Sequence, residues 1–383
     1  MTCPCSLSRF RWLRRLCTLV CVVAGCCSVP PANAQNLDKP LTNIDEDISA
    51  FAFDSGGRIV YAVHRGFKTK LYDLEHDDIW LQEANGKRRR LLEGQKFNRG
   101  NQPFSYIVDS FRWSPNGHLI LAQLLTTTVV DESGKAEDSF MTLLLDDSGR
   151  EIHIAKADSV IPDAANAAWS SDSAGVVYLS EAVKPRQLFS MKFTRLATGS
   201  MPSFYEGRTF LDVAWLPTMT YAIAVEQDHG RTGPPRLQRL DLFSDTDQEL
   251  ATLDGYEGAI SISPSGKMVA YFIDREILEV RDLASPNRIA RLRVGLGVLH
   301  WSPDETRIFL KRSIEKKSGD LVSIDLPPLT ASSAGHDIPV TQPPTVSLLH
   351  GLTFREFAIS PDGRFLAVVA PGKHNLLVFP FPR

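Results

Sequence analysis

The segment Phe357-Ala-Ile359-Ser-Pro-Asp-Gly363, which leads after Arg364 into the apolar run Phe365-Leu-Ala-Val-Val369, decides the fold because its design recurs along the chain. It predicts a short apolar strand, a tight turn and a second apolar strand. In such a turn proline presets φ, aspartate bonds to the backbone and glycine supplies the positive φ. We call the last residue of the first strand the anchor of its unit. The anchors are Phe53, Trp113, Trp169, Trp215, Ile262, Trp301 and Ile359.

The spacing of the anchors sets the architecture. Neighbouring anchors lie between 39 residues (301 − 262) and 60 residues (113 − 53) apart, which fits a four-stranded propeller blade of roughly 40–50 residues plus variable loops. Two further strands are expected in most units: 78–83 and 89–92 in the first, and 140–145 and 151–154 in the second. The sequence therefore predicts an all-β fold, a seven-bladed β-propeller.

The ring has to be closed by the start of the chain. Only 24 residues follow the last anchor (383 − 359), and they hold just two more strands, 365–369 and 375–379. An unclosed ring would leave a sheet edge exposed. We therefore expect an N-terminal strand within 37–48 to pair antiparallel with 375–379, packing Leu41, Ile44 and Ile48. Residues 35–383 then form a single domain, and the Pro-rich stretch 327–344 is interpreted as a loop within or after the sixth blade.

The Ser-Pro-Asp-Gly units, together with third strands such as Asp78-Ile-Trp80, resemble the propeller repeats of the Tol-system periplasmic protein, a WD40-like repeat family. The resemblance covers about residues 45–383 and implies the propeller fold. The Tol-system protein carries an additional α/β domain before its propeller, whereas only about a dozen residues stand in that place here. Peptidases of the prolyl-oligopeptidase group place a hydrolase domain beside such a propeller, whereas this chain ends with its last blade. The resemblance therefore implies a fold rather than a particular activity.

Residues 1–34 predict an export signal. An apolar run over 16–27 follows several basic residues, and Ala32-Asn33-Ala34 fits a cleavage site before Gln35. The run is shorter than the roughly 20 residues that span a bilayer. The basic residues are Arg9, Arg11, Arg14 and Arg15.

Two other interpretations of this segment stay open. Val23-Ala-Gly-Cys26 resembles a bacterial lipobox, which would place a lipid on Cys26, and the apolar run could also be a short buried helix. We expect an exported protein, periplasmic or extracellular, with a lipid-anchored envelope protein as the alternative. No membrane contact is expected beyond the signal segment or that lipid.

Cysteine usage and charge exclude several classes of protein. All six cysteines lie within the first 27 residues, so no disulfide framework, cysteine metal site or thiol nucleophile is expected in the folded body. Residues 1–34 hold four arginines and no acidic residue, so their removal changes the net charge from −3 to −7 (−3 − 4). A mildly acidic protein is not expected to bind nucleic acid. The basic run Lys87-Arg-Arg-Arg90 is interpreted as a charged edge strand.

No linear motif of catalysis or metal binding occurs. The sequence lacks Gly-x-Ser-x-Gly, His-Glu-x-x-His and the phosphate-binding loop pattern, and its nine histidines are scattered. Asp245-Thr-Asp247-Gln-Glu249 has oxygen donors at alternate positions, as a calcium loop does, but it lacks the bending glycine. A hairpin turn is the better interpretation. We therefore predict no catalytic residue, no metal and no cofactor.

Binding is expected on the propeller face that bears the connections between second and third strands. Four of these connections are long, at 64–77, 126–138, 226–235 and 311–319, and long loops on a rigid scaffold concentrate function. The candidate binding residues are His64, Arg65, Lys68, Lys70, Tyr72, Asp131, Glu132, Asp228, His229, Arg231, Lys311 and Arg312.

Two functions of different classes follow. The first is an exported, non-catalytic scaffold that binds a protein, a peptide or an envelope polymer through this face. The alternative is a propeller enzyme, a lactonase-like hydrolase or a lyase, with His, Arg and carboxylate side chains from several blades around a central channel. The chain could also be one subunit of a larger enzyme or transport complex. A deep central pocket lined by those side chains would indicate a propeller enzyme. A broad face of mixed charge would indicate a binding scaffold.

Overall fold

The structure is a computed structural model of the 383-residue chain. It describes residues 40–68, 73–97, 104–129, 136–154, 159–162, 164–183, 188–216, 218, 220–227, 233–242, 244, 246–315, 318–331, 338–349, 356–370 and 372–381. The predicted signal segment therefore lies outside the described residues. Among the described residues, no helix has the length and apolar composition needed to cross a membrane.

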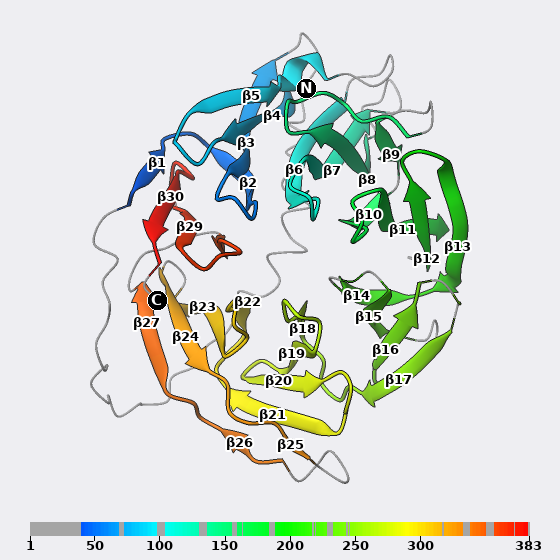
Figure 1. Ribbon diagram of the computed structural model, residues 1–383, viewed down its shortest axis with the longest axis vertical. Coiled ribbons are helices and arrows are strands. Elements are labelled where there is room, and N and C mark those ends of the chain that lie inside the picture. The colour runs from blue at the N-terminus through cyan, green and yellow to red at the C-terminus, as the bar shows by residue number, and fades with distance from the viewer. Residues whose placement is uncertain are drawn as a thin grey trace, which may run out of the picture.

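Seven sheets stand around a common centre, which confirms the predicted seven-bladed β-propeller (Figure 1). Each blade is an antiparallel meander whose first strand is innermost. From the inside outward, blade one has β2 (Ile48–Phe53), β3 (Ile59–Lys68), β4 (Asp73–Gln82) and β5 (Arg88–Leu92), followed by a 3₁₀ turn (Gly94–Lys96); blade two has β6 (Phe104–Trp113), β7 (Leu119–Val129), β8 (Ala136–Asp146) and β9 (Val160–Pro162). Blade three has β10 (Ala164–Trp169), β11 (Gly175–Val183), β12 (Leu188–Arg195) and β13 (Gly199–Arg208); blade four has β14 (Phe210–Trp215), β15 (Tyr221–Glu226), β16 (Arg236–Asp241) and β17 (Asp247–Thr252). Blade five has β18 (Gly258–Ile262), β19 (Met268–Asp274), β20 (Ile277–Asp282) and β21 (Arg288–Arg293); blade six has β22 (Gly297–Trp301), β23 (Arg307–Glu315), β24 (Ser318–Asp325) and β27 (Thr345–Leu349); blade seven has β28 (Phe357–Ile359), β29 (Phe365–Val369), β30 (Leu376–Pro380) and β1 (Thr42–Ile44).

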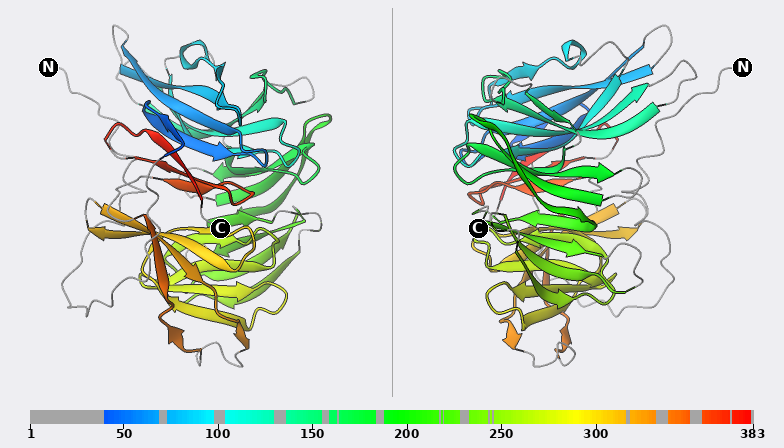
Figure 2. Two further views of the ribbon diagram at one scale, coloured as in Figure 1. Left: turned by 60° about the vertical axis from the view of Figure 1, so that its left-hand side comes forward. Right: turned by 90° about the vertical axis from the view of Figure 1, so that its right-hand side faces the viewer.

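Alternating strand directions give the ring two different faces. Connections between first and second strands, and between third and fourth strands, lie on one face, which we call the turn face. Connections between second and third strands, and those from one blade to the next, lie on the other face, which we call the hairpin face. Figure 1 views the turn face, and Figure 2 shows the strands running between the two faces.

The recurrent turn has one hydrogen-bond pattern that explains its sequence. In blade seven the buried Ser360 Oγ donates to Asp362 Oδ1 (2.6 Å) and accepts from the backbone N–H of Phe365 (2.9 Å). Gly363 has a φ of 69° and donates its N–H to the Ser360 carbonyl (2.8 Å). Because the turn satisfies its own polar groups, it can sit against the apolar core.

The same serine-centred pattern recurs in four other blades. Ser114, Ser170, Ser263 and Ser302 are all buried, and each hydroxyl accepts a backbone N–H from the start of the following strand. In blade one Asp54 replaces the serine and accepts the N–H of Arg58 (2.7 Å). Local turn chemistry therefore fixes the first two strands of these blades.

The hydrophobic core is divided among the interfaces between blades. Each of the seven clusters of buried apolar residues draws its members from two neighbouring blades. Three tryptophan anchors add a hydrogen bond across the interface. Their indole N–H groups donate to carbonyl groups on the innermost strand of the preceding blade: Trp113 to Ala52 (3.3 Å), Trp169 to Arg112 (3.0 Å) and Trp215 to Asn166 (2.7 Å).

The segment expected to close the ring supplies β1, which lies at the outer edge of blade seven. β1 pairs antiparallel with β30, with Thr42 opposite Val378 and Ile44 opposite Leu376. Ile44 is fully buried, but Leu41 is 62% exposed, so Leu41 does not pack as expected. Ile48 is also fully buried, although it belongs to β2 of blade one rather than to the closing strand. The paired stretch is therefore shorter than predicted.

The Pro-rich stretch forms part of a neighbouring blade's edge. It leaves blade six after β24, and its short strands β25 (Thr330–Ala331) and β26 (Val340–Thr341) pair with β21, the outer strand of blade five. Figure 1 shows them outside β21. The stretch lies within the sixth blade as predicted, but it is more than a loop, because its strands cover the outer edge of blade five.

Two predictions about elements were wrong. The outer strand of blade two is β9, at Val160–Pro162, whereas the predicted strand 151–154 makes only an isolated bridge between Glu151 and Leu145. Three of the four expected long loops are mostly strand, because β3–β4, β7–β8 and β23–β24 extend well into 64–77, 126–138 and 311–319. The fourth, 226–235, does lie between strands, since β15 ends at Glu226 and β16 begins at Arg236.

Candidate functional site

The candidate binding residues that the structure describes lie on two blades. His64 and Arg65 are half-buried on β3 of blade one, and Lys311 and Arg312 are half-buried on β23 of blade six. Lys68 ends β3, and its side chain is outside the described residues. Blade seven separates the two pairs, so the structure does not bring them into one contiguous group. The remaining candidates, Lys70, Tyr72, Asp131, Glu132, Asp228, His229 and Arg231, lie outside the described residues.

His64 lies at the centre of an acidic environment. Its Nδ1 is 3.1 Å from Asp77 Oδ1, and its Nε2 is 3.7 Å from Glu75 Oε1. The hydrogen bond to Asp77 raises the pKa of His64, and the charges of Asp77, Glu75 and Asp47 act in the same direction, while burial opposes them. The protonated imidazolium is therefore favoured at this position.

Asp77 is a fully buried link between blades one and two. Its Oδ2 accepts hydrogen bonds from Ser49 Oγ (2.5 Å) and from the backbone N–H of Val108 in blade two (2.8 Å). Its backbone carbonyl accepts the Tyr106 hydroxyl (2.6 Å). Although Ser, His and Asp meet here, Ser49 donates to the aspartate and not to the histidine. The arrangement therefore lacks the serine–histidine contact that activates a nucleophile.

A set of ionisable residues surrounds His64 on the hairpin face, and we call it the blade-one charged surface. It comes from five chain segments that are brought together by blade one and by the closure of the ring. Its members are Asp45, Glu46, Asp47, His64, Arg65, Glu75, Asp78, Arg90, Glu93, Lys96, Lys373 and His374.

Ion pairs with shared partners connect the part of this surface that lies on blade one. Arg65 reaches Glu46 (3.2 Å) and Asp78 (3.6 Å). Arg90 also reaches Asp78 (3.6 Å), and it pairs with Glu93 (3.0 Å). The side chains of Arg65 and Arg90 are 41% and 43% exposed, so water screens these pairs and each contributes little to stability.

The closure of the ring adds the remaining part of the blade-one charged surface, where the two ends of the chain meet. His374 Nδ1 lies 2.6 Å from Asp47 Oδ1, and Lys373 Nζ lies 3.8 Å from Asp45 Oδ1. These residues are far apart in sequence but adjacent because β1 pairs with β30. Sequence reasoning missed them, although the predicted pairing of the two chain ends was a signal that could have found them.

The candidate binding residues on blade six, Lys311 and Arg312, form a smaller group than those on blade one. Arg312 Nη2 lies 4.0 Å from Asp320 Oδ2, while its buried Nε has no hydrogen-bond partner among the described residues. Arg312 is therefore only partly satisfied by its surroundings.

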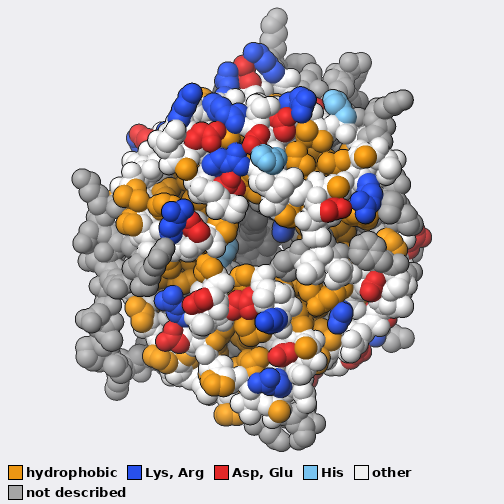
Figure 3. All heavy atoms as spheres, in the orientation of Figure 1, with side chains coloured by type: hydrophobic (Ala, Val, Ile, Leu, Met, Phe, Trp, Pro, Cys, Tyr) orange, Lys and Arg blue, Asp and Glu red, His pale blue; other side chains and the backbone are white. Residues whose placement is uncertain are grey.

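On the turn face, charged side chains gather over blades one and two, beside the central hollow (Figure 3). Arg58 organises the ion pairs there: it bonds to Asp54 (2.6 Å) and to Asp147 of blade two (3.0 Å). Its guanidinium also lies 4.7 Å from the ring centre of Trp113. Since these partners join blades one and two, the group serves the blade interface.

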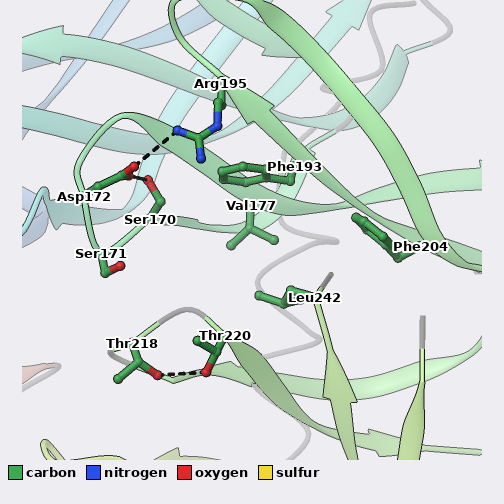
Figure 4. A pocket seen from close by; sticks show the side chains of 10 residues that line it. All are labelled: Ser170, Ser171, Asp172, Val177, Phe193, Arg195, Phe204, Thr218, Thr220 and Leu242. Atoms are coloured by element: carbon green, nitrogen blue, oxygen red, sulfur yellow. Dashed lines mark hydrogen bonds and ion pairs between the residues drawn. The ribbon is translucent and has the colours of Figure 1, made fainter. Parts of the chain in front are cut away.

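A pocket of about 230 Å³ opens on the turn face between blades three and four (Figure 4). Sequence reasoning missed it, because its two walls meet only through the packing of these blades. The one signal in the sequence is the turn 170–175, which the repeat of the blades already explains. The pocket is lined by Ser170, Ser171, Asp172, Val177, Phe193, Arg195, Phe204, Thr218, Thr220 and Leu242.

The innermost strands carry the residue types that the enzyme interpretation requires, and they come from several blades, as that interpretation expects. Arg112, Asp212 and His300 lie on the innermost strands of blades two, four and six. Burial raises the pKa of Asp212 and lowers that of His300 to about 4, whereas Arg112 is exposed. No hydrogen bond or ion pair of the described part of the chain joins any two of them. No group of three or more potential metal ligands occurs among the described residues.

Of the three comparisons with known proteins, only the one with solved structures found matches. No family model matches the chain, and no curated protein matches it. The family assignment suggested by the Tol-system resemblance therefore stays a prediction.

Solved structures do match over nearly the whole chain. A chain in a crystal structure of the mitotic checkpoint complex is 14% identical, with a TM-score of 0.55, and the match covers 96% of this chain and 99% of that chain. The Cps50 (Swd1) β-propeller domain of Myceliophteria thermophila is 11% identical, with a TM-score of 0.56, and the match covers 90% and 99% respectively. At these identities the likeness shows the fold alone: this chain has a WD40-like seven-bladed β-propeller fold.

Proposed function

We propose that the protein is an exported, non-catalytic scaffold that binds a protein partner through the blade-one charged surface. The observation that carries the proposal is this surface itself. Its ionisable residues come from five segments and stand on a rigid base, the fully buried Asp77 with its bonds to Ser49, His64 and Val108. WD40-like propellers are typical scaffolds for protein binding, which supports a protein as the ligand.

The exposure of the surface suits recognition better than stability. Asp45, Lys96 and Lys373 are 61%, 78% and 79% exposed, although each has an ion-pair partner. Exposed charges of this kind speed association and select partners by complementary potential. Counting the buried Asp77 and a protonated His64, seven carboxylates stand against five cationic side chains, a net charge of −2 (5 − 7) while His374 is neutral. A partner with a basic patch fits this surface.

The proposal is tested in two steps: partner proteins are first captured, and their affinity is then measured. The purified protein is used to recover partners from an envelope extract of the source organism, and the affinity of a recovered partner is measured. We expect the double variant Asp45→Lys/Glu46→Lys to weaken binding about tenfold or more at low salt, and the loss to shrink at high salt.

The matched control is Asp274→Lys/Glu276→Lys, which makes the same change of charge at two exposed carboxylates of blade five and breaks the pair of Glu276 with Arg293. It should leave the affinity within about twofold of wild type. If both variants bind alike, or if only polysaccharide is captured, protein binding through the blade-one charged surface is rejected.

Export has its own test. The mass of the protein isolated from its source should correspond to a chain that starts at Gln35, or at a lipidated Cys26 if the lipobox is used. Full-length chain recovered from the cytoplasm would exclude both forms. This result is independent of the binding experiment.

A further inference from the structure

We propose that the pocket between blades three and four is a second binding site, which takes one uncharged aromatic or branched aliphatic side chain from an extended segment of a protein partner. This site lies on the turn face, opposite the blade-one charged surface. Nothing in the proposed function requires it.

The size of the pocket selects a single side chain. Its volume is about 230 Å³, below the roughly 300–1,000 Å³ of sites that enclose a whole small-molecule ligand. One anchoring side chain of a protein partner fits a depression of this size, and such anchors in small pockets commonly dominate the binding energy of an interface.

The inner wall selects an apolar group. Val177, Phe193 and Phe204 come from blade three, and Leu242 comes from blade four. Figure 4 shows these four side chains facing the same space from the two blades. Val177, Phe193 and Leu242 are already buried, so the gain comes from the apolar group itself, which leaves water and packs against them.

The rim selects an uncharged group. Arg195 Nη1 lies 3.3 Å from Asp172 Oδ2, and the two side chains are 45% and 51% exposed. The hydrogen bond from Ser170 lowers the pKa of Asp172, so the carboxylate stays ionised and offsets the guanidinium. A charged occupant would therefore meet a like charge as well as an opposite one.

Hydroxyl groups on both sides of the mouth favour a peptide over a free hydrocarbon. Ser171 on the blade-three side and Thr218 and Thr220 on the blade-four side are exposed, and the two threonine hydroxyls lie 3.1 Å apart. They can exchange hydrogen bonds with the amide groups that flank an anchoring side chain, as water does in the free protein.

The pocket is already formed without a ligand. Gly175 permits the position of Phe193, because a Cβ at residue 175 would stand 2.8 Å from the Phe193 ring. The Arg195 guanidinium lies 5.6 Å from the centre of the same ring. Phe193 is thus held between the backbone of β11 and the rim, so binding costs little reorganisation.

The test uses N-acetyl amino-acid methylamides as probes in a saturation-transfer NMR titration. The phenylalanine and leucine probes should bind at least about fivefold more tightly than the alanine probe. Thr220→Trp, which places a large ring at the mouth, should weaken binding of the phenylalanine probe about tenfold. The control Thr252→Trp, at an exposed threonine of the same blade that does not line the pocket, should change it less than about twofold.

A third variant tests the neutrality of the rim. Asp172→Asn keeps an oxygen that can accept from the backbone N–H of Ala174, but it leaves Arg195 without its carboxylate partner. It should give measurable binding to the N-acetyl glutamate probe, which the wild-type pocket excludes. Equal binding of the alanine and phenylalanine probes, or unchanged binding in Thr220→Trp, overturns the proposal. Because the probes do not involve the hairpin face, that result leaves the proposed function untouched.

Discussion

The indole N–H of Trp169 donates to the carbonyl of Arg112, whereas the buried indole N–H of Trp301 has no acceptor among the described residues. Both tryptophans end an innermost strand, and both are almost fully buried, at 4% and 8% exposed. They belong to the same position of the repeat and differ in one hydrogen bond. This makes them a matched pair in which the value of an inter-blade hydrogen bond can be measured.

We expect Trp169→Phe to cost about 1 kcal/mol more free energy of unfolding than Trp301→Phe. Both changes lose similar apolar contact, but the first also breaks a hydrogen bond, and the second removes an unsatisfied buried donor. Equilibrium unfolding in denaturant measures the difference. Equal losses would show that the bond to Arg112 contributes nothing to stability.

The stability of the protein should depend on pH through two histidines that act in opposite directions. The pKa of His64 is raised in the folded state, so its contribution is complete below its unfolded pKa of about 6.5 and is lost as the pH rises through the folded value. The pKa of His300 is lowered to about 4 by burial, so its contribution is complete above about 6.5 and is lost as the pH falls toward 4.

Two glutamine variants separate these contributions in unfolding measurements from pH 4 to 9. His64→Gln should flatten the loss of stability above about pH 6.5, and His300→Gln should flatten the loss below it. Unchanged slopes in both variants would mean that other groups dominate the pH dependence.

Among the elements, the two pieces of edge cover differ in how much core they contribute. β1 brings the fully buried Ile44 to the cluster shared by blades seven and one. The strands β25 and β26, by contrast, are exposed at all four residues, including Val340 at 39%. Both cover a sheet edge, but only β1 also completes a blade interface.

Deleting residues 35–46 should lower the melting temperature by several degrees and promote aggregation, because it exposes the edge of β30 and removes buried Ile44. Deleting 330–341 should have a smaller effect, since it uncovers the edge of β21 and removes the buried Ile338, but it removes no residue of the clusters that two blades share. Calorimetry and light scattering of the two variants compare them. A larger effect of the second deletion would contradict this account of ring closure.

The elements that could be predicted are those whose signal is local. The turns around Ser114 and Ser360 carry their own hydrogen-bond pattern in the sequence, so the first two strands of those blades were predicted correctly. The strand β9 was not predicted, because an outer strand of three residues has no periodicity that the sequence could reveal. The site residues that sequence analysis missed, such as Asp47 and His374, meet only through pairing between distant strands. Such contacts leave no local pattern.

For the whole molecule, the location of the core predicts cooperative unfolding. Every hydrophobic cluster is shared by two neighbouring blades, so among the described residues no blade has a cluster of its own. A blade removed from the ring would leave two half-clusters open to water.

We therefore expect a single unfolding transition, with coincident midpoints by tryptophan fluorescence and far-UV circular dichroism. A chain that stops before β28 should fail to fold, because it leaves the two clusters that blade seven shares incomplete. Separate transitions, or a stable six-bladed fragment, would show that the blades are more independent than their packing implies.

The pairing of β1 with β30 also determines the order in which the strands of the ring can pair during synthesis. Thr42 and Val378 are neighbours in the sheet, but 336 positions separate them along the chain (378 − 42). A chain synthesised from its N-terminus produces β1 first and its partner last, so β1 waits through the synthesis of six blades. Contacts of such sequence separation are slow to form, because a long loop must close before they contribute any stability. The earliest strand to be made is thus the last to become fixed, and until then the nascent ring has a gap.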